Sequence, residues 1–165
     1  MDIWDLRRRR NSQSEIGRLM GVSRQAINKA YRIIDQKVEQ AFMEAADVNH
    51  LEPRTVNLVE GITEAYSPAY KVPVIVSFSK ANGVKVWYLY EGNCRECHLE
   101  GSCRRTLENE AEERGISLTA VDKLRTPTQL ASRIFGAGAD DERSRLACER
   151  FEVHRKPVKN SARLI

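Results

Sequence analysis

The sequence predicts an α+β protein, in which a helical N-terminal part precedes a small α+β domain containing a β-hairpin. Closely spaced helix starts near the N-terminus lead into a long segment with helical apolar periodicity. Further on, two runs rich in β-branched and aromatic residues flank Asn82-Gly83, the favoured turn pair of a β-hairpin. We expect three parts: residues 1–46, residues 47–136 and a flexible charged tail at residues 137–165.

The segment 13–32 predicts two helices joined by a tight turn, the first over residues 13–20 and the second from residue 24. Ser12 and Glu15 have the spacing of a capping box, which starts a helix. Gly21 can adopt the positive φ that a helix end requires, and Ser23 can cap the second helix. We expect Gly17 at the closest approach of the two helices. Their shared core is expected to contain Ile16, Leu19, Met20, Val22, Ile27 and Ala30.

These residues have the spacing of a helix-turn-helix, whose second helix lies in the DNA major groove. Residues 11–46 resemble the helix-turn-helix of archaeal Tfx-type regulators, and also the related motif of sigma factors and LuxR-type regulators. The resemblance implies a transcription regulator that binds double-stranded DNA. It implies nothing about the cysteines further along the chain.

The polar side of the second helix has residue types that suit base recognition, because Arg can pair with guanine and Asn or Gln with adenine. The candidate DNA-binding residues are Ser23, Arg24, Gln25, Asn28, Lys29 and Arg32. Between residues 7 and 32 there are seven Arg and one Lys against a single acid, although the whole chain carries only +4. This local charge suits phosphate contacts. The alternative is an ordinary solvated face of a helical hairpin.

Residues 1–10 provide few apolar side chains for the helix that normally precedes such a motif. Either this first helix is short or the true start of the chain lies upstream. The cations from Arg7 to Arg10 are expected either to contact the DNA backbone or to form a solvated helix end.

The second helix is expected to continue to about Ala46, because no Gly or Pro interrupts it. Its apolar positions follow a heptad-like seam: Ile27, Tyr31, Ile34, Val38, Ala41 and Ala45. We favour pairing of this seam with a second copy, which predicts a homodimer. The alternative is that Ile34, Val38 and Phe42 pack on the second domain of the same chain.

The second domain is less regular in sequence. Val56, Leu58, Val59 and Ile62 suggest a short strand, followed by the hairpin of residues 74–78 and 84–90. After Cys103 we expect a helix to about Arg114, then a strand over residues 116–121. Thr126 and Pro127 predict the start of a further helix, which Gly136 would end.

Cys94, Cys97 and Cys103 lie within ten residues in a polar segment, which predicts a metal site rather than buried packing. A helix beginning near Cys103 would lower its thiol pKa and favour the ligand form. Zinc needs a fourth ligand, and an iron–sulfur cluster is the other candidate cofactor. Candidate fourth ligands are His50, His98, Cys148, His154 or a partner residue. Cys94 to His98 also has the haem-attachment pattern, which is disfavoured without an export signal. Free or redox-active thiols are the alternative.

The composition is that of a globular protein, with 41% hydrophobic and 30% charged residues in 165. No apolar run is long enough for a membrane span, and no signal region is present, so we expect a cytoplasmic protein. The expected function is a sequence-specific DNA-binding transcription regulator that responds to metal, an iron–sulfur cluster or redox state, and is not an enzyme. The alternative is a redox or metal-dependent enzyme with a nucleic-acid-binding module. Neither paired carboxylates nor a phosphate loop supports that alternative.

Overall fold

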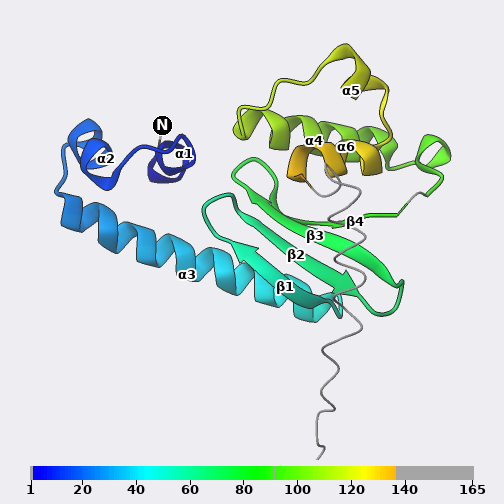
Figure 1. Cartoon of the computed structure of the whole chain (residues 1–165), viewed down its shortest axis with the longest axis horizontal. Coiled ribbons are helices and arrows are strands. Elements are labelled where there is room, and N and C mark those ends of the chain that lie inside the picture. The colour runs from blue at the N-terminus through cyan, green and yellow to red at the C-terminus, as the bar shows by residue number, and fades with distance from the viewer. Residues whose placement is uncertain (1, 91, 137–165) are drawn as a thin grey trace, which may run out of the picture.

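The computed structural model describes residues 2–90 and 92–136, and the predicted α+β class is confirmed (Figure 1). The elements follow one another as α1 (Ile3–Arg8), α2 (Gln13–Met20), α3 (Arg24–Val48), β1 (Glu52–Asn57), β2 (Ile62–Ser67), β3 (Val72–Ser79), β4 (Gly83–Tyr88), the 3₁₀ turn η1 (Cys94–Glu96), α4 (Glu100–Glu113), α5 (Ala120–Leu124) and α6 (Pro127–Phe135). The predicted tail at residues 137–165 lies outside the described residues. Among the described helices, none is both long and apolar enough to cross a membrane.

Strands β1 to β4 form one antiparallel sheet in which each strand pairs with the next along the chain. The predicted hairpin is β3–β4, and Gly83 has a φ of 66°. The predicted short strand at residues 56–62 is wrong, because these residues end β1, make a turn and begin β2. Pro53 lies inside β1, where the register shifts. An edge strand tolerates proline because one side of its backbone needs no ladder hydrogen bond.

Helices cover both faces of the sheet. Alternate side chains of β3 and β4 point to opposite faces, as the period of two in a strand requires. Val74 and Val76 pack with α3, whereas Trp87 and Leu89 pack with α4 and α6. In Figure 1, α3 runs along one side of the sheet, and α4 and α6 lie on the other.

The C-terminal half of α3 packs on the sheet of its own chain. Val38, Phe42 and Ala46 are buried there, and Ile34 packs at the edge of the same cluster. This packing was the alternative to a seam between two copies. The predicted use of the seam for pairing is therefore wrong for Val38, which is already buried against the sheet. The homodimer remains a prediction, and its interface would have to use a surface other than the buried part of this seam.

A separate small cluster joins the first three helices. Leu6, Ile16 and Ile27 form its buried centre, with Ile3 and Tyr31 at its margin. The short first helix, α1, covers this cluster with Leu6. Three of the predicted core positions, two at the end of α2 and one in the turn, are wrong: exposed fractions are 65% for Leu19, 42% for Met20 and 46% for Val22. A helix as short as α2 buries the side chains of one side only, and α1 packs against the side that contains Ile16.

The segment after the hairpin is more helical than predicted. Helix α4 begins at Glu100, so Cys103 lies one turn inside it and not before it. The strand predicted over residues 116–121 is wrong, because Thr119 caps helix α5 through a reciprocal bond with Asp122. The last predicted helix is confirmed as α6, which Thr126 caps and Gly136 ends.

Candidate functional site

The two helices α2 and α3 and the turn between them form one unit, here called the α2–turn–α3 unit (residues 12–32). Both bonds of the predicted capping box between Ser12 and Glu15 are present. Gly21 ends α2 with a φ of 67°, and the Ser23 Oγ accepts a hydrogen bond from the Ala26 backbone N–H at 3.1 Å. The helix ends at residues 20 and 24 are those predicted from the caps.

Gly17 holds the two helices close together. A Cβ atom at this position would lie 2.7 Å from the backbone oxygen of Val22. Real side chains do not come this close, so only glycine fits this backbone. The prediction that a side chain at position 17 would be obstructed is confirmed, although the atom in the way belongs to the turn and not to α3.

All six candidate DNA-binding side chains lie on the exposed side of α3. Ser23, Arg24, Gln25, Asn28, Lys29 and Arg32 are exposed. Asn28 Nδ2 donates to Gln13 Oε1 at 3.5 Å, and Ser23 is occupied as the helix cap. No ion pair engages the three cations of this set within the described residues. Their charge is therefore available to an anionic partner.

Arg7 and Arg8, at the end of α1, fit neither the predicted contact with the DNA backbone nor the predicted solvated helix end. Arg7 pairs with Asp35 on α3, and its guanidinium carbon lies 4.5 Å from the centre of the Tyr31 ring. The side chain of Arg8 is 5% exposed and pairs with Glu113 on α4 at 2.8 Å. DNA-backbone contact and a solvated helix end are both wrong for these two residues. Arg9 and Arg10 remain exposed.

The charge of the candidate surface is accordingly smaller than the sequence count. With Arg7 and Arg8 paired inside the molecule, the exposed cations from residue 9 to residue 32 are Arg9, Arg10, Arg18, Arg24, Lys29 and Arg32. Glu15 is the acid in the same range, so the local excess is +5 (6 − 1). This excess is still larger than the net charge of the whole chain.

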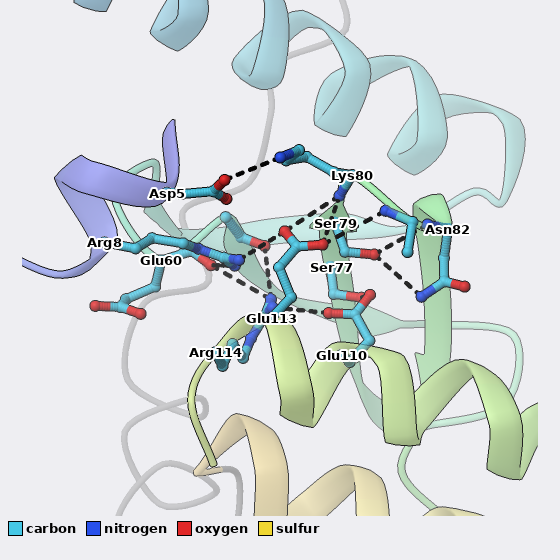
Figure 2. A network of polar contacts seen from close by, with 12 residues as sticks. Asp5, Arg8, Glu60, Ser77, Ser79, Lys80, Asn82, Glu110, Glu113 and Arg114 are labelled. Atoms are coloured by element: carbon cyan, nitrogen blue, oxygen red, sulfur yellow. Dashed lines mark hydrogen bonds and ion pairs between the residues drawn. The ribbon is translucent and has the colours of Figure 1, made fainter. Parts of the chain in front are cut away.

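A polar network connects α1 to α4 and to the sheet (Figure 2). Glu113 accepts hydrogen bonds from Arg8 Nη1 at 2.8 Å and from the Lys80 backbone N–H at 2.9 Å. Arg8 and Arg114 both donate to the Glu60 carbonyl oxygen, at 2.7 and 3.3 Å. The network thus holds α1 against the domain that carries the cysteines. Sequence reasoning missed it, because its members are up to 105 residues apart.

The three nearby cysteines are not grouped as metal ligands in the part of the chain that the structure describes. Cys97 is exposed, Cys94 and Cys103 are half-buried, and none is in a disulfide. Across residues 2–90 and 92–136, no three His, Cys, Asp or Glu side chains are arranged to hold a metal ion. His50 and His98 are exposed and join no such group. Cys148 and His154 lie outside the described residues.

The predicted lowering of the Cys103 pKa is wrong. Burial raises the pKa of this thiol, and the charges of Cys97 and Cys94 raise it further. Cys103 lies a full turn inside α4, and its backbone N–H donates to the Leu99 carbonyl. It therefore does not meet the free N–H groups that would stabilise a thiolate. Cys94 Sγ lies 3.5 Å from Thr128 Oγ1 on α6.

Comparisons with protein families, with curated proteins and with solved structures found no match to this chain. The function is therefore argued from the residues themselves.

Proposed function

We propose that this protein is a sequence-specific DNA-binding transcription regulator and that the α2–turn–α3 unit is a helix-turn-helix. In this proposal the N-terminal half of α3 lies in the major groove of double-stranded DNA. The observation that carries the proposal is the exposure, on one side of this helix, of side chains suited to base edges. Arg24, Gln25 and Asn28 are exposed close to a capped helix start.

The charge around this unit supports the same proposal. Exposed cations outnumber acids by five between residues 9 and 32, and neutralising phosphates releases counterions from DNA. The network that anchors α1 supports it indirectly. Arg8 belongs to this network and Arg7 pairs with Asp35 on α3, so both are engaged within the chain, which leaves the cations of α2 and α3 for a partner.

Base recognition by α3 is tested after selecting a binding site from random double-stranded DNA. Arg24→Ala and Gln25→Ala are each expected to weaken binding to the selected site by about 5- to 150-fold, because a good bidentate base contact contributes about 1–3 kcal/mol. Binding to unrelated DNA is expected to change little in Gln25→Ala. Fluorescence anisotropy measures both affinities.

Two matched variants control this experiment. Gln36→Ala removes an exposed glutamine from the second half of α3, and Arg105→Ala removes an exposed arginine from α4. Both are expected to retain the affinity of the unaltered protein. Equal binding by all four variants, or a selection that yields no preferred sequence, would contradict the proposal.

The metal and redox parts of the predicted function also remain proposals. Any zinc or iron–sulfur site must recruit a ligand beyond the three nearby thiols, from another part of the chain or from a partner. Binding of two copies to two half-sites also remains a proposal. It requires an interface other than the buried half of α3.

A further inference from the structure

An apolar groove lies between the α2–turn–α3 unit and the sheet. It has a volume of about 450 Å³ and is open to solvent. We call it the α1–α3 groove. Its apolar lining consists of Ile3, Trp4, Met20, Ile34, Val38 and Phe78. Its volume lies within the range of about 300–1,000 Å³ that small-molecule sites occupy, and its lining is mostly apolar, as in such sites.

The floor of the groove consists of side chains that are packed against one another. Trp4 and Val38 are buried, and the Trp4 ring meets the Phe78 ring edge to face with centroids 5.5 Å apart. Met20, by contrast, is exposed although it belongs to the lining. A ligand seated here would cover the exposed methionine and lie on a surface that is already formed.

The charged side chains of the lining differ in what they contact. Lys80 is engaged, because its Nζ lies 2.8 Å from an Asp2 oxygen and 2.9 Å from an Asp5 oxygen. Lys37 lines the groove and is exposed, and it forms no ion pair or hydrogen bond within the described part of the chain. Asp2 also lines the groove, and it pairs with Lys80, so the cation of the lining that is left for a partner is Lys37.

We propose that the α1–α3 groove binds a small amphipathic carboxylate, with its hydrocarbon chain along the apolar lining and its carboxylate beside Lys37. Burial of the chain supplies most of the affinity. The contact with the lysine selects an anion over a neutral or cationic head group. Met20 immediately precedes Gly21, so the ligand contacts the end of α2 at the turn into α3.

The proposal is tested with decanoate below the concentration at which it forms micelles, by calorimetry and by methyl NMR. Decanoate is expected to bind and to shift the methyl signals of Ile3, Met20, Ile34 and Val38. Decyltrimethylammonium, which has the same chain and a cationic head, is expected to bind more weakly. Absence of decanoate binding, or shifts confined to other methyl groups, would overturn the proposal.

Two pairs of variants locate the chain and the head group. Met20→Glu places a charge against the chain and is expected to weaken decanoate binding about tenfold or more. Leu19→Glu makes the same change at the neighbouring exposed residue outside the lining, and is expected to leave binding within twofold. Equal binding by the two variants would rule out this groove.

Lys37→Ala is expected to weaken decanoate binding about threefold, as for an exposed ion pair, and to leave decanol binding unchanged. Lys85→Ala, at an exposed lysine outside the lining, is the matched control. Equal losses for decanoate and decanol would refute the role of the lysine. Sedimentation of the free protein tests the rival occupant, because a dimer that Met20→Glu dissociates would assign the groove to a second copy. None of these measurements involves DNA, so they are independent of the proposed regulator function.

Discussion

Glu110 and Arg114 form an ion pair that is almost completely withdrawn from solvent. Their side chains are 0% and 4% exposed, and their charged atoms lie 2.8 Å apart on successive turns of α4. Ser77 Oγ donates to Glu110 at 3.2 Å, and the Trp87 indole N–H donates to Ser77. Burial lowers the pKa of Arg114 to about 10, which still leaves the guanidinium protonated near neutral pH. Each buried charge is therefore compensated by the charge of its partner.

Removing one partner leaves the other charge buried without compensation. Glu110→Gln is expected to lower the free energy of unfolding by about 3–5 kcal/mol, as for other broken buried pairs. Urea denaturation followed by circular dichroism measures this loss. Glu108→Gln, at an exposed position on the same helix, is the control and is expected to change stability by less than about 0.5 kcal/mol. Similar values for the two variants would show that the pair is not a determinant of stability.

At the scale of elements, the contact between α2 and α3 depends on the absence of a side chain at Gly17. The nearest atom is the Val22 backbone oxygen in the turn, which cannot rotate away as a side chain could. The position of α3, and with it the direction of Arg24 and Gln25, therefore depends on this close approach.

Gly17→Ala is expected to destabilise the protein by about 1–3 kcal/mol, because the added methyl group forces the backbone of the turn to shift. Gly101→Ala is the matched control. It also lies in a helix, but its nearest neighbour is Arg105 Nη1 at 3.8 Å, an ordinary contact. This control is expected to be neutral or to stabilise by up to about 1 kcal/mol, the usual preference of a helix for alanine. The unfolding temperatures of both variants are measured by thermal denaturation. Equal stability of Gly17→Ala and Gly101→Ala would show that the backbone of the turn can move to accommodate the methyl group.

At the scale of the whole molecule, α3 belongs to two cores. Ile27 is buried with Leu6 and Ile16, whereas Phe42 is buried against the sheet. The pair between Arg8 and Glu113 connects α1 to α4, which packs on the other face of the sheet, as Figure 2 shows for the pair itself. The helices next to the proposed DNA interface are thus held to the domain that contains the cysteines.

The predicted metal site concerns the whole chain, because the described residues contain no group of three side chains arranged to hold a metal ion. If the predicted cofactor exists, protein purified without oxygen is expected to contain either one zinc ion or iron with sulfide, and Cys97→Ser is expected to lose it. Elemental analysis and the visible absorption spectrum measure this. Metal-free protein with three titratable thiols would instead favour the thiol alternative.

Much of the N-terminal part could be predicted from the sequence, because its signals are local. Ser12, Glu15, Gly21 and Ser23 act on backbone atoms within three or four residues, and the helices end where these residues indicate. The β3–β4 hairpin follows from Asn82-Gly83 for the same reason. The strand predicted at residues 116–121 failed because the cap at Thr119 outweighed a short apolar alternation.

The sequence by itself determined the class of the fold, both ends of α2, the start of α3 and the set of polar residues there. Only the tertiary structure decided which cations are free, since Arg7 and Arg8 find their acids 28 and 105 residues away. It also decided that the apolar side of α3 packs on the sheet of its own chain. Caps and turns depend on neighbours in sequence, whereas burial and charge pairing depend on neighbours in space.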